Sequence, residues 1–146
     1  MRRFLLLVLS LALVTVSVGC GGGPKPIPKE EYLKRADVIC KKGSDDLRAK
    51  SEAAFKDIKQ GEKPTPAQIA EFVRNTVVPL LRSQVNQLRK LPPPEKLKSE
   101  AAAIYKELDK GLDELAKDPT KLTTTNVFSK ANDLAKKSGL VVCQGS

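Results

Sequence analysis

The first apolar stretch of the chain has no polar face. Phe4–Val18 is apolar except for Ser10, Thr15 and Ser17, and two arginines precede it. A basic start, an apolar centre and small residues afterwards are typical of an export signal. A membrane-spanning helix is the alternative, but it needs about 20 apolar residues, and here glycines and prolines follow directly. We therefore expect residues 1–19 to form a signal peptide.

Beyond residue 28 the apolar positions recur three or four residues apart, which is the spacing of amphipathic helices. Glycine or proline separates four such segments, at residues 29–60, 66–91, 95–117 and 126–138. No stretch between them alternates apolar and polar residues over the length of a strand. The pattern predicts an all-α fold, a four-helix antiparallel bundle-like domain over residues 29–146.

Local signals refine these helices. Thr65-Pro66-Ala67-Gln68 has the order of a capping box with proline at the first helical position. Gly43-Ser44 suggests a kink or a brief break in the first helix, and Pro79 suggests a kink in the second. The Thr123–Asn126 stretch offers N-caps for the fourth helix, which Gly139 would end.

A short segment links the signal to the helices. Residues 20–28 contain Gly21–Gly23 and then alternating prolines. Glycine gives such a linker freedom, whereas proline extends it. We expect a flexible tether that does not pack against the domain.

Composition excludes several kinds of chemistry. The chain has no histidine, so it cannot build a Ser-His-Asp or Cys-His site, or a zinc site with imidazole ligands. Gly21–Gly23 follows the signal segment rather than a strand, so it is not a phosphate-binding loop. We expect no catalytic site, no metal site and no cofactor.

Some carboxylates and tyrosines remain as candidates for binding or acid–base work. Asp45 with Asp46, or Asp109 with Asp113 and Glu114, could hold a cation or act as acid and base. Helical charge pairs with neighbouring lysines explain the same residues without any chemistry. The side chains of Tyr32 and Tyr105 fit the core margin of their helices, although they could also contact a ligand.

The net charge of +9 could favour anionic partners such as lipid headgroups or cell-wall polymers. Positive and negative residues alternate along the helices, however, as on ordinary solvated faces. An exported protein would rarely meet nucleic acid, so we expect no nucleic-acid partner.

Three cysteines cannot all pair within one molecule, so one of them needs another fate. If Cys20 carries lipid, Cys40 and Cys143 are left, and the first and fourth helices of an up-down bundle are neighbours. A Cys40–Cys143 disulfide could then tie the C-terminal tail to the first helix. Two buried free thiols are the alternative.

Short motifs resemble a known group of proteins. Glu31–Cys40 contains Ala-Asp-Val-Ile-Cys, Leu88–Pro93 contains a Leu-x-x-Leu-Pro-Pro connector, and Gly139–Cys143 reads Gly-Leu-Val-Val-Cys. Together they resemble a family of small secreted actinobacterial lipoproteins that is largely uncharacterised. The resemblance implies a helical fold and a pairing of Cys40 with Cys143, and it implies no known activity.

The residues around Cys20 resemble a bacterial lipobox. Val18 and Gly19 suit the two positions before the cysteine, whereas Ser17 departs from the aliphatic residue preferred there. The resemblance implies cleavage before Cys20 and a diacylglyceryl group on its sulfur, and two acyl chains are enough for stable anchoring. It places the protein on the extracytoplasmic face of the cell membrane.

We therefore expect a lipid-anchored binding or structural module, whose partner could be an envelope protein, a wall polymer or a small ligand. Electrostatic binding to anionic envelope polymers is the first alternative. A carboxylate-only envelope hydrolase is the second, since glycosidases can work with two acidic residues.

Overall fold

The regular structure of the protein is helical. The computed structural model describes residues 25–59 and 61–139, and over these two ranges it contains helices and no strand. The elements are α1 (Lys29–Phe55), α2 (Pro66–Phe72), η1 (Val73–Val77), α3 (Val78–Arg89), η2 (Glu95–Leu97), α4 (Lys98–Lys117), α5 (Lys121–Thr124) and α6 (Ser129–Ser138). The predicted all-α class is confirmed.

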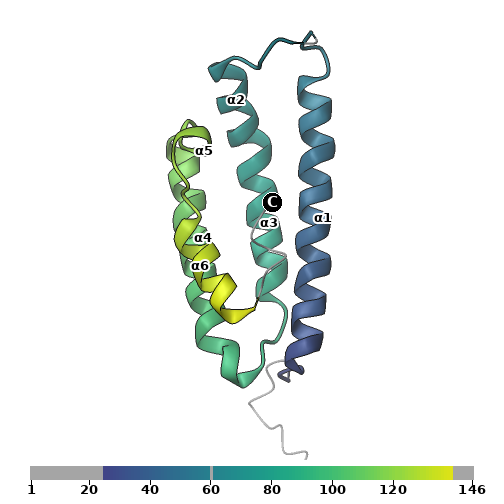
Figure 1. Cartoon of the computed structure of the whole chain (residues 1–146), viewed down its shortest axis with the longest axis vertical. Helices are drawn as coiled ribbons and strands as arrows, with labels where there is room; N and C mark the ends of the chain where they lie inside the picture. The colour runs from purple at the N-terminus through teal and green to yellow at the C-terminus, as the bar shows by residue number, and fades with distance from the viewer. Residues whose placement is uncertain (1–24, 60, 140–146) are drawn as a thin grey trace, which may run out of the picture.

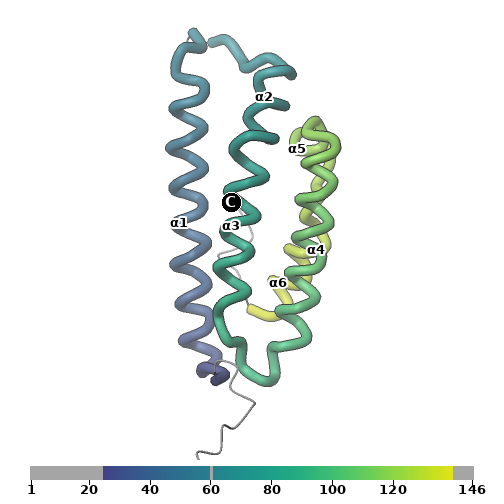
Figure 2. The backbone as a smooth tube through the Cα atoms, turned by 180° about the vertical axis from the view of Figure 1, so that it is seen from behind, coloured from purple at the N-terminus to yellow at the C-terminus, as the bar shows by residue number. Residues whose placement is uncertain are grey.

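The long helices lie side by side (Figure 1). α1 packs against α3, α3 against α4, and α4 against α6. Viewed from behind, α3 lies between α1 and α4 (Figure 2). α6 has only 10 residues against 27 in α1, so it covers a limited part of the assembly.

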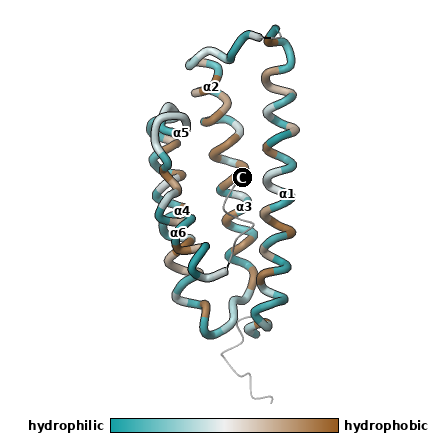
Figure 3. Tube along the Cα trace, viewed as in Figure 1, coloured by the Kyte–Doolittle hydropathy of each residue, from teal (hydrophilic) through white to brown (hydrophobic). Residues whose placement is uncertain are grey.

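Two clusters of buried residues hold the helices together. The first joins α1, α3, α4 and α6 and consists of Tyr32, Ala36, Cys40, Leu88, Ile104 and Ala135. The second lies near the π-helical segment η1 and consists of Val73, Val77, Val78 and Leu115. Hydrophobic and hydrophilic residues alternate along each helix, as amphipathic packing requires (Figure 3).

Two end signals read from the sequence are confirmed. The backbone N–H of Thr65 donates to Gln68 Oε1 at 2.8 Å, and the Gln68 N–H donates to Thr65 Oγ1 at 3.3 Å, which completes the capping box of α2. Gly139 follows α6 with a φ of 82°, in the left-handed region that glycine adopts without a Cβ clash.

The expected break at Gly43-Ser44 is wrong. α1 runs without interruption through both residues, and Gly43 is buried. A Cβ at this position would lie 2.6 Å from the side-chain Cδ of Gln84 on α3. Gly43 therefore serves the close approach of two helices rather than a change of direction.

The expected limits of the first and fourth helices also need correction. α1 ends at Phe55, so Ile58 lies outside it. Thr123 and Thr124 belong to α5, and α6 starts at Ser129 after Phe128 with no side-chain cap. The threonine hydroxyls are engaged elsewhere, because those of Thr123 and Thr124 both donate to the Thr120 carbonyl.

One residue of the predicted tether, Ile27, packs against the domain. Ile27 is half-buried against the first cluster, and its N–H donates to the Pro92 carbonyl at 3.4 Å. Ile27 therefore contacts the domain, although it lies within the 20–28 segment that the sequence predicts not to pack.

Candidate functional site

An open groove runs between α1 and the adjoining η1–α3 segment, and we call it the α1–α3 groove. Its volume is about 380 Å³. The α1 wall consists of Ile39, Lys42, Gly43, Asp46 and Lys50, and the facing wall consists of Asn75, Thr76, Pro79, Leu80, Ser83, Gln84 and Gln87. Each wall is a ladder of residues three or four positions apart, because these residues share one face of their helix.

Uncharged polar groups dominate the η1–α3 wall. The side chains of Asn75, Thr76, Ser83 and Gln87 form no hydrogen bond with any other residue in the described ranges. An amide carries donors and an acceptor, and a hydroxyl can act as either. The groove therefore presents neighbouring hydrogen-bonding groups that the described part of the chain leaves unused.

Gln84 closes the bottom of this groove. Its amide lies directly against Gly43, and its Nε2 donates to the Cys40 carbonyl at 3.4 Å. That contact joins the middle of α1 to the middle of α3.

The helix wall is distorted where Pro79 enters it. Proline has no N–H, so the Asn75 carbonyl lacks its ordinary α-helical donor. The Val78 N–H donates to the Val73 carbonyl, five residues back, and the usual partner of the Arg74 carbonyl is thereby diverted. The kink expected at Pro79 takes the form of this π-helical turn, which widens the helix before the proline.

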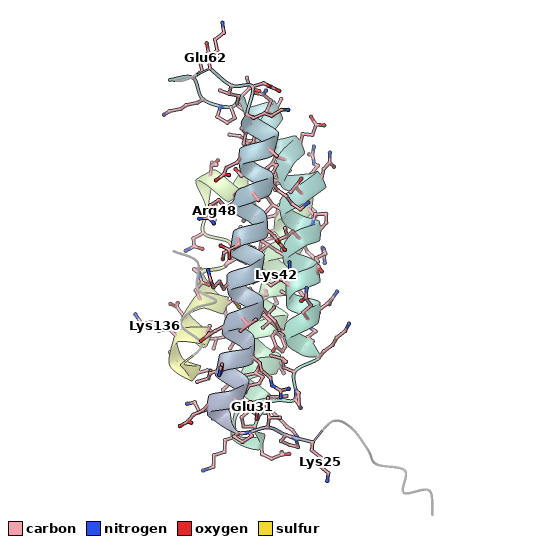
Figure 4. The ribbon with its side chains drawn as sticks, turned by 90° about the vertical axis from the view of Figure 1, so that its right-hand side faces the viewer. Lys25, Glu31, Lys42, Arg48, Glu62 and Lys136 are labelled. Atoms are coloured by element: carbon pink, nitrogen blue, oxygen red, sulfur yellow. The ribbon has the colours of Figure 1, made fainter. Side chains whose placement is uncertain are left out.

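The charges in the groove lie on α1. Lys42 Nζ contacts Asp46 Oδ2 at 2.7 Å, which makes an ion pair one helical turn apart. Lys50 has no ion-pair partner in the described ranges. Lys42 lies on the side of α1 that borders α3, whereas Arg48 lies on the opposite edge (Figure 4). The pair neutralises itself, so the remaining charge of the groove is that of Lys50.

A second hollow lies behind Gln84, and we call it the Cys40 cavity. Its volume is about 210 Å³. The lining residues are Cys40, Leu81, Gln84, Val85, Leu88, Leu108, Leu112, Asn126, Phe128 and Asn132. The lining is mainly apolar and contains no charged side chain, in contrast to the α1–α3 groove.

The predicted site cysteines are placed only in part. Cys40 is buried in the first cluster, with 2% of its surface exposed. Cys20 and Cys143 lie outside the described residues, so lipidation and the disulfide stay predictions.

The candidate carboxylates all lie in ion pairs. Asp45 contacts Lys41 and Arg48, and Asp46 contacts Lys42. On α4, the pairs are Asp109 with Arg89, Asp113 with Arg82, and Glu114 with Lys121. Within the described ranges no three Asp, Glu or Cys residues come together as a metal site would require.

The two tyrosines form a hydrogen-bonded pair in which Tyr32 is buried and Tyr105 is partly buried. The Tyr105 hydroxyl donates to the Leu88 carbonyl at 3.1 Å and lies 2.9 Å from the Tyr32 hydroxyl, which therefore donates to it. Burial, followed by the contact with Tyr32, raises the pKa of Tyr105 well above its ordinary value. Tyr32 is 1% exposed, and both rings pack as core residues.

Sequence reasoning did not find the α1–α3 groove. The sequence does show polar residues one or two turns apart at Asn75, Ser83 and Gln87, but any solvated helix face has them. Only the pairing of α1 with α3 brings this face opposite Lys42 and Asp46.

Two further findings bear on the function. None of the helices in the described ranges is long and apolar enough to span a membrane. Comparison of the chain with protein-family models, curated proteins and solved structures finds no match.

Proposed function

We propose that this protein is a lipid-anchored module of the extracytoplasmic membrane face, which binds a component of the cell envelope in the α1–α3 groove. The observation that carries the binding role is the row of Asn75, Thr76, Ser83 and Gln87 side chains without partners in the described ranges. Ligand sites are usually concave surfaces in which a small number of polar groups fix the orientation of the ligand.

The anchoring part of the proposal rests on the sequence. It assigns signal cleavage before Cys20, acylation of that cysteine and membership of the lipoprotein family named above. Intact mass of the membrane-extracted protein tests it: we expect the mass of residues 20–146 plus a diacylglyceryl group. A mass equal to the uncleaved and unmodified chain would rule the anchor out.

The proposal also includes the Cys40–Cys143 disulfide. Asn132 of α6 and Cys40 line the same cavity, so α6 lies close to this cysteine. α6 ends at Ser138, five residues before Cys143, and five extended residues reach about 17 Å. That reach supports the pairing, which would bring the apolar residues before Cys143 towards the Cys40 cavity.

Binding is tested with the full-length protein in detergent. It is mixed with envelope material that has been stripped of lipid, so the anchor makes no contribution to retention. We expect the protein to sediment with this material. Ser83→Tyr, which fills the groove, should abolish sedimentation. Ser129→Tyr places the same ring at an exposed position outside the groove and should leave it unchanged.

Equal sedimentation of the two tyrosine variants would contradict the groove as the binding site. Retention that disappears at high salt in both variants would instead support the electrostatic alternative, because interactions between exposed charges are screened by salt.

A further inference from the structure

The shape and chemistry of the α1–α3 groove indicate what kind of molecule it holds. The inference rests on the proposed function, since it concerns the ligand of the same groove. Along α1 the lining extends from Ile39 to Lys50, and along the facing wall from Asn75 to Gln87. At 1.5 Å per residue both walls are about 17 Å long. A groove of this length suits an extended segment of a linear molecule.

The polar groups of the groove are suited to a ligand rich in hydroxyl groups. Amides on Asn75 and Gln87 and hydroxyls on Thr76 and Ser83 offer both donors and acceptors. Because they have no partner in the described ranges, a ligand can use them without breaking any interaction found there. Each hydrogen bond between groove and ligand then replaces a hydrogen bond to water, so the ligand loses little free energy when it leaves the solvent.

The π-helical turn changes the backbone hydrogen bonding next to this wall. The carbonyls of Arg74 and Asn75 have both lost their ordinary α-helical donors, because Val78 donates to Val73 and Pro79 has no N–H. A helix carbonyl points towards the C-terminal end of its helix, so the Asn75 carbonyl points towards Pro79, which lines the groove.

Charge and apolar surface argue against other ligands. A polyanion would need several free cations, but Lys42 is paired with Asp46, and only Lys50 of the groove lysines lacks a partner in the described ranges. A bound amphipathic helix would need a continuous apolar floor. The apolar side chains here are Ile39, Pro79 and Leu80, which are few enough to contact the C–H faces of a polar ligand.

We infer that the α1–α3 groove binds an extended segment of an uncharged glycan. Hydroxyl groups of the glycan pair with Asn75, Ser83 and Gln87, and its C–H faces lie on Pro79 and Leu80. The Lys42–Asp46 pair borders the site and contributes polar contacts without selecting for charge.

The test is an NMR titration of the full-length protein in detergent with linear tetrasaccharides of glucose and of N-acetylglucosamine. We expect saturable shifts at Asn75, Ser83 and Gln87 that are the same at low and high salt. Gln87→Leu should weaken binding about tenfold, which corresponds to about 1.4 kcal/mol. Asn86→Leu is the matched control, since Asn86 is exposed but does not line the groove, and it should bind as the wild type does.

Dextran sulfate and a polar decapeptide serve as competing probes. Binding of either one in the groove without binding of a neutral tetrasaccharide would overturn the glycan inference and leave the binding module intact. Absence of tetrasaccharide shifts, together with sedimentation that Ser83→Tyr abolishes, would have the same meaning. If Ser83→Tyr leaves sedimentation unchanged, the proposed function itself fails.

Discussion

Two glycines are buried in helices, and each allows a close contact of a different kind. Gly43 faces the end of the flexible Gln84 side chain. A Cβ on Gly111 would lie 2.7 Å from the Phe128 ring and 2.9 Å from the Val127 carbonyl oxygen, which is backbone. A side chain can rotate away from a new methyl group, whereas the backbone of residues 127–128 can move only together with its neighbours.

We therefore expect Gly111→Ala to destabilise the protein by about 1–3 kcal/mol, the usual cost of overpacking a core. Gly43→Ala should change the free energy of unfolding by less than about 1 kcal/mol, because the gain in helix propensity offsets the displacement of Gln84. Denaturant unfolding of both variants measures the difference. Equal losses of unfolding free energy in the two variants would contradict this prediction, because they would show that residues 127–128 shift as easily as the Gln84 side chain does.

The tyrosine pair depends on one acceptor. The Tyr32 hydroxyl is buried and donates to Tyr105, whose own proton goes to the Leu88 carbonyl. Tyr105→Phe leaves the Tyr32 hydroxyl without this acceptor, and an unpaired buried polar group costs about 1–3 kcal/mol. Tyr32→Phe keeps the bond to Leu88 and should cost less. The double variant should lose less stability than the two single losses combined, as measured by a double-mutant cycle in urea.

The same pair makes stability depend on pH in the alkaline range. Burial, and next the Tyr32 contact, raise the pKa of Tyr105, so the folded protein keeps the phenolic proton where the unfolded chain releases it. The contribution of Tyr105 to the free energy of unfolding is complete below about pH 10, the ordinary tyrosine pKa, and it declines as the pH rises further. We expect unfolding free energies to fall above that pH, and to fall less steeply in Tyr105→Phe. Parallel curves for the two proteins would exclude this origin.

At the scale of the elements, the sequence predicts those helix ends that are determined by residues close together in the chain. Thr65, Pro66 and Gln68 mark the start of α2 because a capping box is complete within four residues. Gly139 marks the end of α6 for the same reason. The prediction of a break at Gly43 was wrong because this glycine makes room for the Gln84 side chain of α3. The sequence does not show which helices pack against each other.

The groove could not be predicted for a related reason. Its two walls are 25 or more residues apart in the sequence, and each by itself resembles an ordinary solvated face. The sequence predicts that Pro79 disturbs its helix, but it does not show which neighbouring helix the disturbed face lies against. Only the structure places it beside α1.

Pro79 also gives a test at this scale. Pro79→Ala restores an N–H that can donate to the Asn75 carbonyl, so we expect it to stabilise the protein by about 1 kcal/mol. The gain is smaller than the roughly 3 kcal/mol cost of a proline inside a helix, because the π-helical turn already relieves part of that cost. The gain is measured by thermal unfolding. Pro66→Ala is the control: at the first helical position no N–H bond is lost to proline, so the effect should be smaller. A loss of stability in Pro79→Ala would show that the turn forms for another reason.

At the scale of the whole molecule, the proposed disulfide would close most of the domain into one loop. Cys40 and Cys143 are 103 positions apart, and disulfides typically add about 2–4 kcal/mol. We expect Cys143→Ser to lower the free energy of unfolding by that amount, and a reductant to lower the wild type to the same level. Cys20→Ser should leave stability unchanged. If the reductant has no effect on the wild type, the pairing is wrong.

Gln84 belongs to the walls of both the α1–α3 groove and the Cys40 cavity, and it donates a hydrogen bond to the Cys40 carbonyl. A molecule that shifts this amide from one side changes the space available on the other. If the proposed Cys40–Cys143 disulfide changes the position of Gln84, then a ligand in the groove and the disulfide change each other's stability by the same free energy, because linkage is reciprocal.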